Sequence, residues 1–416
     1  MRAMKIVLTL IVSVFALSSW AADKTTAYTD WGWPLPYQKV SDKSVKWLKD
    51  KGWWPLKLGT QPAFTGFFTW QEKGFAKQRG LEIEFVRLMT GPAINEAAAS
   101  GNVHAGFQGN FPFITLIANK VPVKAIGIAQ VNNLSATLVP PGSPINSLKD
   151  LKKISPTPAF GIVSGSSAEF YFQAAAEFNG LVVGKDVILT NMPPAEMATM
   201  PKGLTGVVQW DPWVTEQVEM RKNAKMIDTV FAYNFYHGAF WIRDEIIKNA
   251  PDVAQALADM YVESILWSRL HFDESIAVYT NDTSHRWFKK ELMVPFFKLW
   301  VVNYKPTWMH VDPRFWAIED SRIVDWLYKT GRLKEKLSVD DLAGYFVPDF
   351  MNRTFDKLGW AKPKIPTFLP KNWSGQVGKL PYPESYHVNN LKQPLPFPEK
   401  EDLVGKWYFN GKSFSP

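Results

Sequence analysis

The chain has 416 residues, a length typical of two or three domains of ~150 residues each. Hydrophobic residues make up 46% of it, which is enough to build cores and excludes an intrinsically disordered protein. The formal net charge is +8, but the basic residues are scattered and form no basic block, which excludes a typical nucleic-acid binder. Because the chain contains no Cys, it has no disulfides, no lipid attached to Cys and no thiol chemistry.

The first 21 residues have the pattern of a cleavable secretory signal. Arg2 and Lys5 flank an apolar run over residues 6–17, and small residues follow at Ser19 and Ala21. The run is shorter than the ~18 apolar residues that a membrane span needs, and no later stretch reaches that length. We therefore predict export with removal of this segment, and a free periplasmic protein.

Short strand-like runs alternate with helical segments in the first part of the chain, after an extension over residues 22–54. The expected strands are 56–59, 81–86, 103–107 and 123–129, and the expected helices are 67–77, 93–100 and 112–119. Such alternation predicts a largely parallel sheet covered by helices.

The cluster Leu138-Val139-Pro140-Pro141-Gly142 interrupts this pattern and is a candidate hinge. The pattern then repeats, with strands expected at 159–163, 187–190, 206–210 and 238–242 and helices at 148–152, 168–179 and from 193. Helical periodicity dominates residues 246–328, and a Pro-rich and aromatic-rich tail follows residue 363.

Several short motifs occur in an order that resembles one family, the substrate-binding proteins of the nitrate/sulfonate/taurine ABC importers. They are Gly91-Pro92-Ala93, Gln108-Gly109-Asn110-Phe111-Pro112, Pro141-Gly142-Ser143-Pro144-Ile145 before Leu148-Lys149-Asp150-Leu151, Ser164-Gly165-Ser166-Ser167, Trp210-Asp211-Pro212-Trp213 and Phe240-Trp241-Ile242-Arg243. The resemblance covers residues 55–275. The family usually has Asp in the turns that precede two cleft strands, where this chain has His104 and Thr205, a difference that leaves the ligand open.

The resemblance implies an α/β protein with the two-lobe periplasmic-binding-protein fold (type II). Each lobe is then a mainly parallel sheet flanked by helices, with extra C-terminal helices and a tail. We assign residues 55–138 and 237–362 to lobe 1, 139–236 to lobe 2 and 363–416 to the tail. A small-molecule ligand is expected to close the lobes by hinge motion, and a membrane permease of an ABC importer to recognise the closed form. We expect a monomer that needs no cofactor, metal or nucleic acid.

The motif Ser164-Gly165-Ser166-Ser167 lies between a strand and a helix. A helix start offers unpaired N–H groups and about half a positive charge, glycine permits close approach, and serine hydroxyls add donors. Together these features predict an oxyanion site for sulfonate, phosphate or carboxylate. The alternative is an ordinary N-cap, a position that Ser favours.

Polar and aromatic residues also follow the other expected strands, and ligands of open α/β sheets bind beyond the carboxyl ends of the strands. The further candidate ligand-binding residues are Gln61, Phe64, Thr65, Gly91, Gln108, Gly109, Asn110, Trp210, Trp213 and Tyr236. For these residues the alternatives are turn formation and core packing. Asp211, which precedes Pro212, is expected to cap the next helix.

The leading functional hypothesis is a binding protein for a small anionic organic solute, a sulfonate or similar oxyanion. The 19 Trp, 13 Tyr and 28 Phe motivate an alternative, a planar aromatic or heteroaromatic acid, including a vitamin or redox cofactor. A third hypothesis is a Cys-independent periplasmic enzyme on the same fold. We expect no enzyme, because the desulfinases and pyrimidine synthases that the resemblance brings in depend on Cys and no metalloprotease, nucleophile-elbow or phosphate-loop motif occurs.

Overall fold

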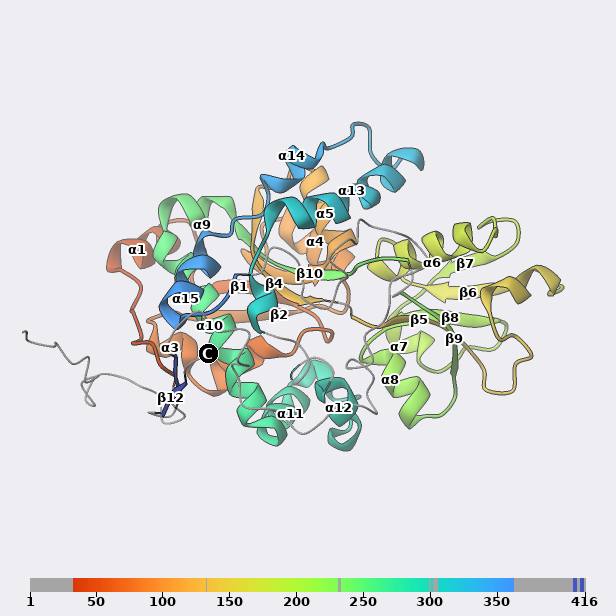
Figure 1. Cartoon of the computed structure of the whole chain (residues 1–416), viewed down its shortest axis with the longest axis horizontal. Coiled ribbons are helices and arrows are strands. Elements are labelled where there is room, and N and C mark those ends of the chain that lie inside the picture. The colour runs from red at the N-terminus through yellow and green to blue at the C-terminus, as the bar shows by residue number, and fades with distance from the viewer. Residues whose placement is uncertain are drawn as a thin grey trace, which may run out of the picture.

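A computed structural model of the chain describes residues 33–131, 133–230, 233–298, 301, 306–362, 407–409 and 412–414. The expected signal and nearly all of the expected tail therefore lie outside the described residues. Two five-stranded sheets, each with its own helices, form two lobes that lie side by side (Figure 1). Within the described residues, no helix is both long enough and apolar enough to cross a membrane.

The sheet of lobe 1 has the strand order β2-β1-β3-β10-β4. Its strands are β1 (Leu56–Thr60), β2 (Ile83–Arg87), β3 (Ala105–Gly109), β4 (Val123–Val131) and β10 (His237–Arg243). β2, β1 and β3 are parallel, and β10 runs antiparallel to both of its neighbours. β3 and β10 are buried along their whole length, as expected for central strands with helices on both faces.

The sheet of lobe 2 repeats this arrangement with the order β7-β6-β8-β5-β9. Its strands are β5 (Ser135–Val139), β6 (Ala159–Ile162), β7 (Ile188–Asn191), β8 (Gly206–Trp210) and β9 (Lys225–Thr229). β7, β6 and β8 are parallel, whereas β5 is antiparallel to both neighbours. The fold is thus the expected two-lobe fold with mainly parallel sheets, and one strand of each sheet is reversed.

The hinge expected at residues 138–142 is wrong. Leu138 and Val139 are buried residues of β5 and already belong to the second sheet. The chain therefore crosses between the sheets after Val131 and before Ser135, and it returns between Thr229 and His237.

The helices cover both sheets and continue well beyond the last strand of lobe 1 (Figure 1). They are α1 (Asp42–Asp50), α2 (Thr69–Glu72), α3 (Phe75–Gln78), α4 (Gly91–Ala99), α5 (Asn110–Ala118), α6 (Ser167–Phe178), α7 (Pro194–Met197), α8 (Trp213–Thr215), α9 (Asp244–Asn249), α10 (Pro251–Leu270), α11 (Phe272–Asn281), α12 (Lys290–Phe297), α13 (Pro313–Lys329), α14 (Val339–Ala343) and α15 (Asp349–Leu358). A short hairpin pairs β11 (Trp407–Phe409) with β12 (Lys412–Phe414).

Two expected helices differ from the prediction. The helix expected at 67–77 is broken into short pieces, because Gly74 adopts a φ of 71° that ends α2 before α3 begins. The helix expected at 148–152 is instead a 3₁₀ helix over Leu148–Lys153.

Helix α13 packs against both lobes. Its Trp326 ring lies 5.6 Å from Phe111 of lobe 1 and 6.1 Å from Phe170 of lobe 2, measured between ring centroids. Nearer its middle, Asp320 accepts a hydrogen bond of 2.9 Å from Nε2 of buried His237, the first residue of β10. The helix therefore braces the lobes on one side of the second chain crossing.

Candidate functional site

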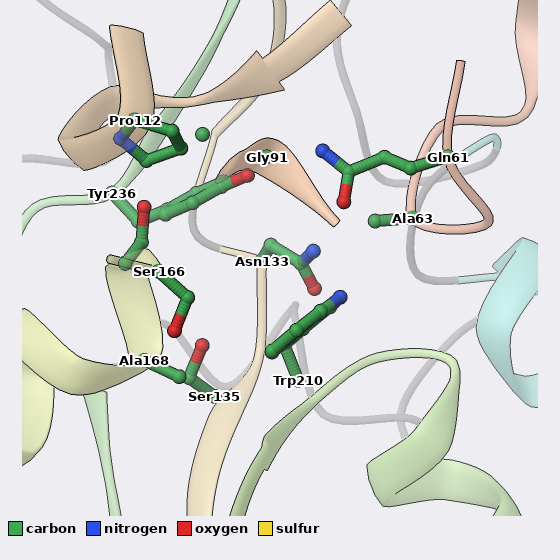
Figure 2. Close-up of a pocket in the computed structure, with 12 residues that line it drawn as sticks. Gln61, Ala63, Gly91, Pro112, Asn133, Ser135, Ser166, Ala168, Trp210 and Tyr236 are labelled. Atoms are coloured by element: carbon green, nitrogen blue, oxygen red, sulfur yellow. The ribbon is translucent and has the colours of Figure 1, made fainter. Parts of the chain in front are cut away.

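A cavity lies between the lobes, beyond the carboxyl ends of strands from both sheets (Figure 2). Its lining residues are Gln61, Ala63, Gly91, Gly109, Pro112, Asn133, Ser135, Ser166, Ser167, Ala168, Trp210 and Tyr236. The cavity has a volume of about 30 Å³. The cavity is thus small in this conformation, with the two lobes close together around it.

Half of the predicted site residues line this cavity. They are Gln61, Gly91, Gly109, Ser166, Ser167, Trp210 and Tyr236. The other predicted residues are not part of the lining, namely Phe64, Thr65, Gln108, Asn110, Ser164, Gly165 and Trp213. The sequence reasoning missed five lining residues, Ala63, Pro112, Asn133, Ser135 and Ala168.

Three helix starts converge on the cavity. α4 begins at Gly91, α5 follows its N-cap Gly109, and α6 begins at Ser167 after its N-cap Ser166, and all four residues belong to the lining. None of the twelve lining residues carries a charge. The partial positive charges of three helix starts therefore face one small space without a neutralising carboxylate in the lining, an arrangement that favours an anion.

The two serines at the start of α6 have different roles. The Ser166 hydroxyl accepts a hydrogen bond from the Glu169 N–H (3.2 Å) and donates one to the Val163 carbonyl (2.7 Å), so it is an N-cap. The Ser167 hydroxyl instead donates to Asn110 Oδ1 (3.1 Å) and accepts from the Phe111 N–H (3.3 Å). Ser167 thereby joins α6 of lobe 2 to the start of α5 in lobe 1.

The backbone donors of the loop before α6 are partly occupied. The Ser164 N–H donates to Asn191 Oδ1 (2.9 Å), and the Gly165 N–H donates to Glu169 Oε2 (2.7 Å). In contrast, the N–H groups of Ser167 and Ala168 have no partner among the described residues. The donors left for a ligand therefore lie in the first turn of α6 itself, somewhat later in the chain than the sequence suggested.

The two tryptophans of the Trp210-Asp211-Pro212-Trp213 motif point to different surroundings. Trp210 ends β8 and forms a wall of the cavity, as Figure 2 shows. Trp213 is fully buried and packs against Phe288, with 4.8 Å between ring centroids. Of the two, Trp210 alone is placed to touch a ligand in the cavity.

Asp211 has the capping role expected from the sequence. Its Oδ1 accepts hydrogen bonds from the N–H (2.9 Å) and the hydroxyl (2.8 Å) of Thr215. Burial raises its pKa to about 7, because desolvation penalises the ionised carboxyl. Burial likewise raises the pKa of the Tyr236 phenol, so this cavity residue is neutral at physiological pH.

Two buried amide side chains, those of Gln61 and Asn133, line the cavity. Gln61 Nε2 donates weakly to the Phe107 carbonyl at 3.4 Å. Asn133, in the first chain crossing, is 1% exposed, and its side-chain oxygen has no hydrogen-bond partner among the described residues. The side chains of Gln61, Asn133, Trp210 and Tyr236 surround one central space in Figure 2. The unpaired Asn133 oxygen is an acceptor, so it is available to a hydrogen-bond donor of a polar ligand.

The resemblance leads one to expect Asp at the positions of His104 and Thr205. Each of these residues accepts a backbone hydrogen bond, as an Asp would, at the end of its sheet that lies away from the cavity. His104 Nδ1 accepts a hydrogen bond from the Lys57 N–H (3.0 Å), and Thr205 Oγ1 accepts one from the Ala159 N–H (3.1 Å). Each residue precedes the first residue of a central strand, β3 or β8, whereas the cavity lies at the carboxyl ends. These two replacements therefore say nothing about the ligand, contrary to our expectation.

Two similar lobes, two chain crossings and a cavity between the lobes define a periplasmic-binding-protein fold. The family model described as "NMT1/THI5 like" matches residues 61–274, about half of the chain. The protein belongs to this family. The match includes the whole cavity lining and stops within α11, so the later helices lie outside it.

Two relatives are similar in sequence. A protein of Bacillus subtilis (strain 168), named for binding aliphatic sulfonates, is 23% identical over 239 residues, which cover 54% of this chain and 69% of that protein. The taurine-binding periplasmic protein of Escherichia coli (strain K12) is 25% identical over 197 residues, which cover 46% of this chain and 58% of that protein. The second match thus spans less than two thirds of the relative.

Solved structures confirm the fold. The periplasmic nitrate-binding protein NrtA from Synechocystis PCC 6803 has a TM-score of 0.62 and 16% identity, and the match covers 81% of this chain and 98% of that one. Together with the sequence relatives, this similarity confirms the predicted resemblance to substrate-binding proteins of the nitrate/sulfonate/taurine importers.

Proposed function

We propose that this protein is the periplasmic solute-binding component of an ABC importer and that it binds a small anionic organic solute, a sulfonate or similar oxyanion. The observation that carries the proposal is the convergence of three helix starts, those of α4, α5 and α6, on a cavity with an uncharged lining. Such a site can hold an anion by neutral N–H and O–H donors, without a basic side chain. The names of the relatives, which refer to sulfonates, taurine and nitrate, support the same class of ligand.

The donors suit the oxygens of a tetrahedral or planar oxyanion. The free N–H groups of Ser167 and Ala168 approach from lobe 2, and the start of α4 at Gly91 faces the same space from lobe 1. Because the donors come from more than one part of the fold, a ligand that bridges them favours the closed arrangement of the lobes. A membrane permease is the proposed partner of that closed form, and residues 1–21 are the proposed export signal.

Trp210 and Tyr236 support a second candidate, a planar aromatic or heteroaromatic acid. Both line the cavity and offer flat apolar surfaces on which a ring can stack. The cavity volume of about 30 Å³ is small in this arrangement of the lobes, so any organic acid, and one with a ring most of all, requires wider separation of the lobes. The small oxyanion therefore remains the leading candidate.

A hydrolytic enzyme is a poorer interpretation of the same cavity. Nucleophilic catalysis by serine needs a base within hydrogen-bond reach of the hydroxyl. The Ser166 hydroxyl donates to a backbone carbonyl and the Ser167 hydroxyl to an amide oxygen, and neither acceptor is a base. We therefore propose binding without a catalytic step.

Isothermal titration calorimetry of the mature protein tests this proposal. The panel contains methanesulfonate, ethanesulfonate, taurine, benzenesulfonate and nitrate, with the uncharged sulfonamides of methane-, ethane- and benzenesulfonate as neutral counterparts. We expect binding of at least one anion and much weaker binding of its neutral counterpart. Heat from the sulfonamides alone would overturn the proposal. Mass spectrometry of small molecules released from the natively purified protein identifies the ligand independently.

A further inference from the structure

A carboxylate lies directly behind the proposed anion site. Glu169, in the first turn of α6, has a side chain that is only 5% exposed, and its Oε2 accepts the hydrogen bond from the Gly165 N–H. It therefore shapes the loop that leads into Ser166 and Ser167. An ionised carboxylate at this place also opposes the positive potential on which an anion site at the start of α6 depends.

Arg332 neutralises that carboxylate from outside both sheets. Its guanidinium donates two hydrogen bonds to Glu169, from Nη1 to Oε2 (3.0 Å) and from Nη2 to Oε1 (2.7 Å). The guanidinium also lies 4.7 Å from the centroid of the Trp326 ring, which is wedged between Phe111 and Phe170. The pairing with Glu169 raises the pKa of Arg332. This charge is thus held in a fixed place by a fork of hydrogen bonds and by an aromatic face.

We propose that Arg332 is a positioning residue for anion binding, which sets the charge of the site at the start of α6 by neutralising Glu169. The proposal rests on the function proposed above. Arg332 lies beyond residues 61–274, so the charge of the family's cavity is controlled here by a segment outside the family match.

Removing each partner has opposite consequences for a bound anion. Without Arg332, the buried Glu169 carboxylate is left without its cation and repels the ligand through a medium of low effective dielectric. Without the charge of Glu169, a Gln at this position still accepts the hydrogen bond from Gly165, and Arg332 then attracts the ligand. If the only role of Arg332 is to hold α6 against α13, then removing Arg332 and removing the charge of Glu169 each weaken binding. The double variant then binds weakly too.

The test is a double-mutant cycle measured by calorimetry at pH 8. The probe is the tightest-binding anion among methanesulfonate, ethanesulfonate, taurine and nitrate, and ethanesulfonamide serves as a neutral probe. We expect Arg332→Met to raise the Kd of the anion at least about tenfold. Glu169→Gln is expected to leave the Kd unchanged or lower it, and the double variant to return within about threefold of the wild type. The Kd of the neutral probe should not change in any variant.

The ion pair between Lys329 and Glu177 provides a matched control. It links the last residue of α13 to α6, at 3.2 Å, but both side chains are more than 70% exposed and lie at the far end of α6. Lys329→Met should therefore leave anion binding unchanged, because exposed ion pairs contribute little. A tenfold loss in this variant would show that any weakened contact between the two helices weakens binding, which overturns a charge-setting role for Arg332.

The outcomes separate this proposal from the proposed function. A wild-type protein that binds no anion contradicts both. A wild-type protein that binds an anion with an unchanged Kd in Arg332→Met contradicts this proposal alone. If Arg332→Met fails to fold, Glu169→Gln still tests the proposal. A weaker affinity of Glu169→Gln for the anion would show that Glu169 acts structurally.

Discussion

The two lobes share a strand order but contribute different kinds of groups to the cavity. Lobe 1 contributes the starts of α4 and α5. At each start a glycine lines the cavity, Gly91 for α4 and Gly109 for α5. A methyl group at Gly109 would lie 2.5 Å from the Ser167 hydroxyl across the cleft. Lobe 2 contributes serine hydroxyls, the Trp210 wall and, behind them, Glu169, which pairs with Arg332 of the C-terminal segment. The comparison indicates that lobe 1 sets the distance between the lobes, whereas lobe 2 sets the chemistry of the site.

The largest expected effect is a loss of stability that distinguishes the two tryptophans of lobe 2. Trp213 is fully buried against Phe288, so Trp213→Ala should lower the free energy of unfolding by about 3–5 kcal/mol. Trp210→Ala should cost less stability, weaken the ligand and abolish any ligand-induced quenching of Trp fluorescence, because Trp210 lines the cavity. Chemical denaturation and fluorescence titration measure the two quantities. Quenching that persists in Trp210→Ala would contradict its place in the site.

The second prediction uses the opposite responses of the lobes to pH. In lobe 2, burial raises the pKa of Asp211 from 3.8 to about 7, so the folded state holds this proton more tightly and loses stability as pH rises between these values. In lobe 1, burial, with Arg243 and Lys57 nearby, lowers the pKa of His104 from 6.5 to about 4. The unfolded state then binds that proton more tightly, and stability is lost as pH falls from 6.5 towards 4.

Two isosteric variants test these signs. Asp211→Asn keeps the acceptor for Thr215 and should raise the free energy of unfolding at pH 8, relative to its effect at pH 4, by about 3 kcal/mol. His104→Gln keeps an acceptor for the Lys57 N–H and should reduce the loss of stability on the acid side. Denaturant melts at pH 4, 6 and 8 give the free energies. A stabilisation by Asp211→Asn that is equal at all three values would show that the carboxyl is ionised throughout.

The third prediction concerns the glycine that separates the lobes. Gly109 has a φ of −64°, which any residue adopts, so Gly109→Ala strains no backbone. Its methyl group would instead meet Ser167 and Tyr236 and oppose closure, at a cost of about 2 kcal/mol, or ~30-fold in Kd. Gly91→Ala is the matched variant within lobe 1, because its methyl group would overlap Pro112 of the same lobe and should lower stability instead. Small-angle X-ray scattering should show a more open Gly109→Ala protein, and an unchanged Kd would refute the assignment.

The fold was largely predictable because strand and helix periodicities alternate in the sequence. β5 was missed because its last residues run directly into Pro140-Pro141, which led us to interpret the strand as a hinge. β9, an edge strand over Lys225–Thr229, was missed because its residues show no clean alternation of buried and exposed positions.

The candidate site was predictable only where a local pattern marked it. Glycines and serines at helix starts have such a pattern, and Gly91, Gly109, Ser166 and Ser167 were identified by it. Asn133 has none, because its place depends on where the chain crosses between the sheets. The Glu169–Arg332 pair joins residues 163 positions apart, and no spacing in the sequence indicates that they meet.

The smallest expected effect separates the two serines at the start of α6. The Ser166 hydroxyl caps the helix, so Ser166→Ala should lower the free energy of unfolding by about 1 kcal/mol and leave the Kd almost unchanged. The Ser167 hydroxyl bonds to Asn110 and Phe111 across the cleft, so Ser167→Ala should instead weaken the ligand by about 1 kcal/mol. For both variants, calorimetry measures the Kd and thermal melts measure the stability. The contacts assign Ser166 to its own helix and Ser167 to the opposite lobe. An equal loss of affinity in the two variants would contradict this assignment, because it would mean that both hydroxyls of the loop bind the ligand.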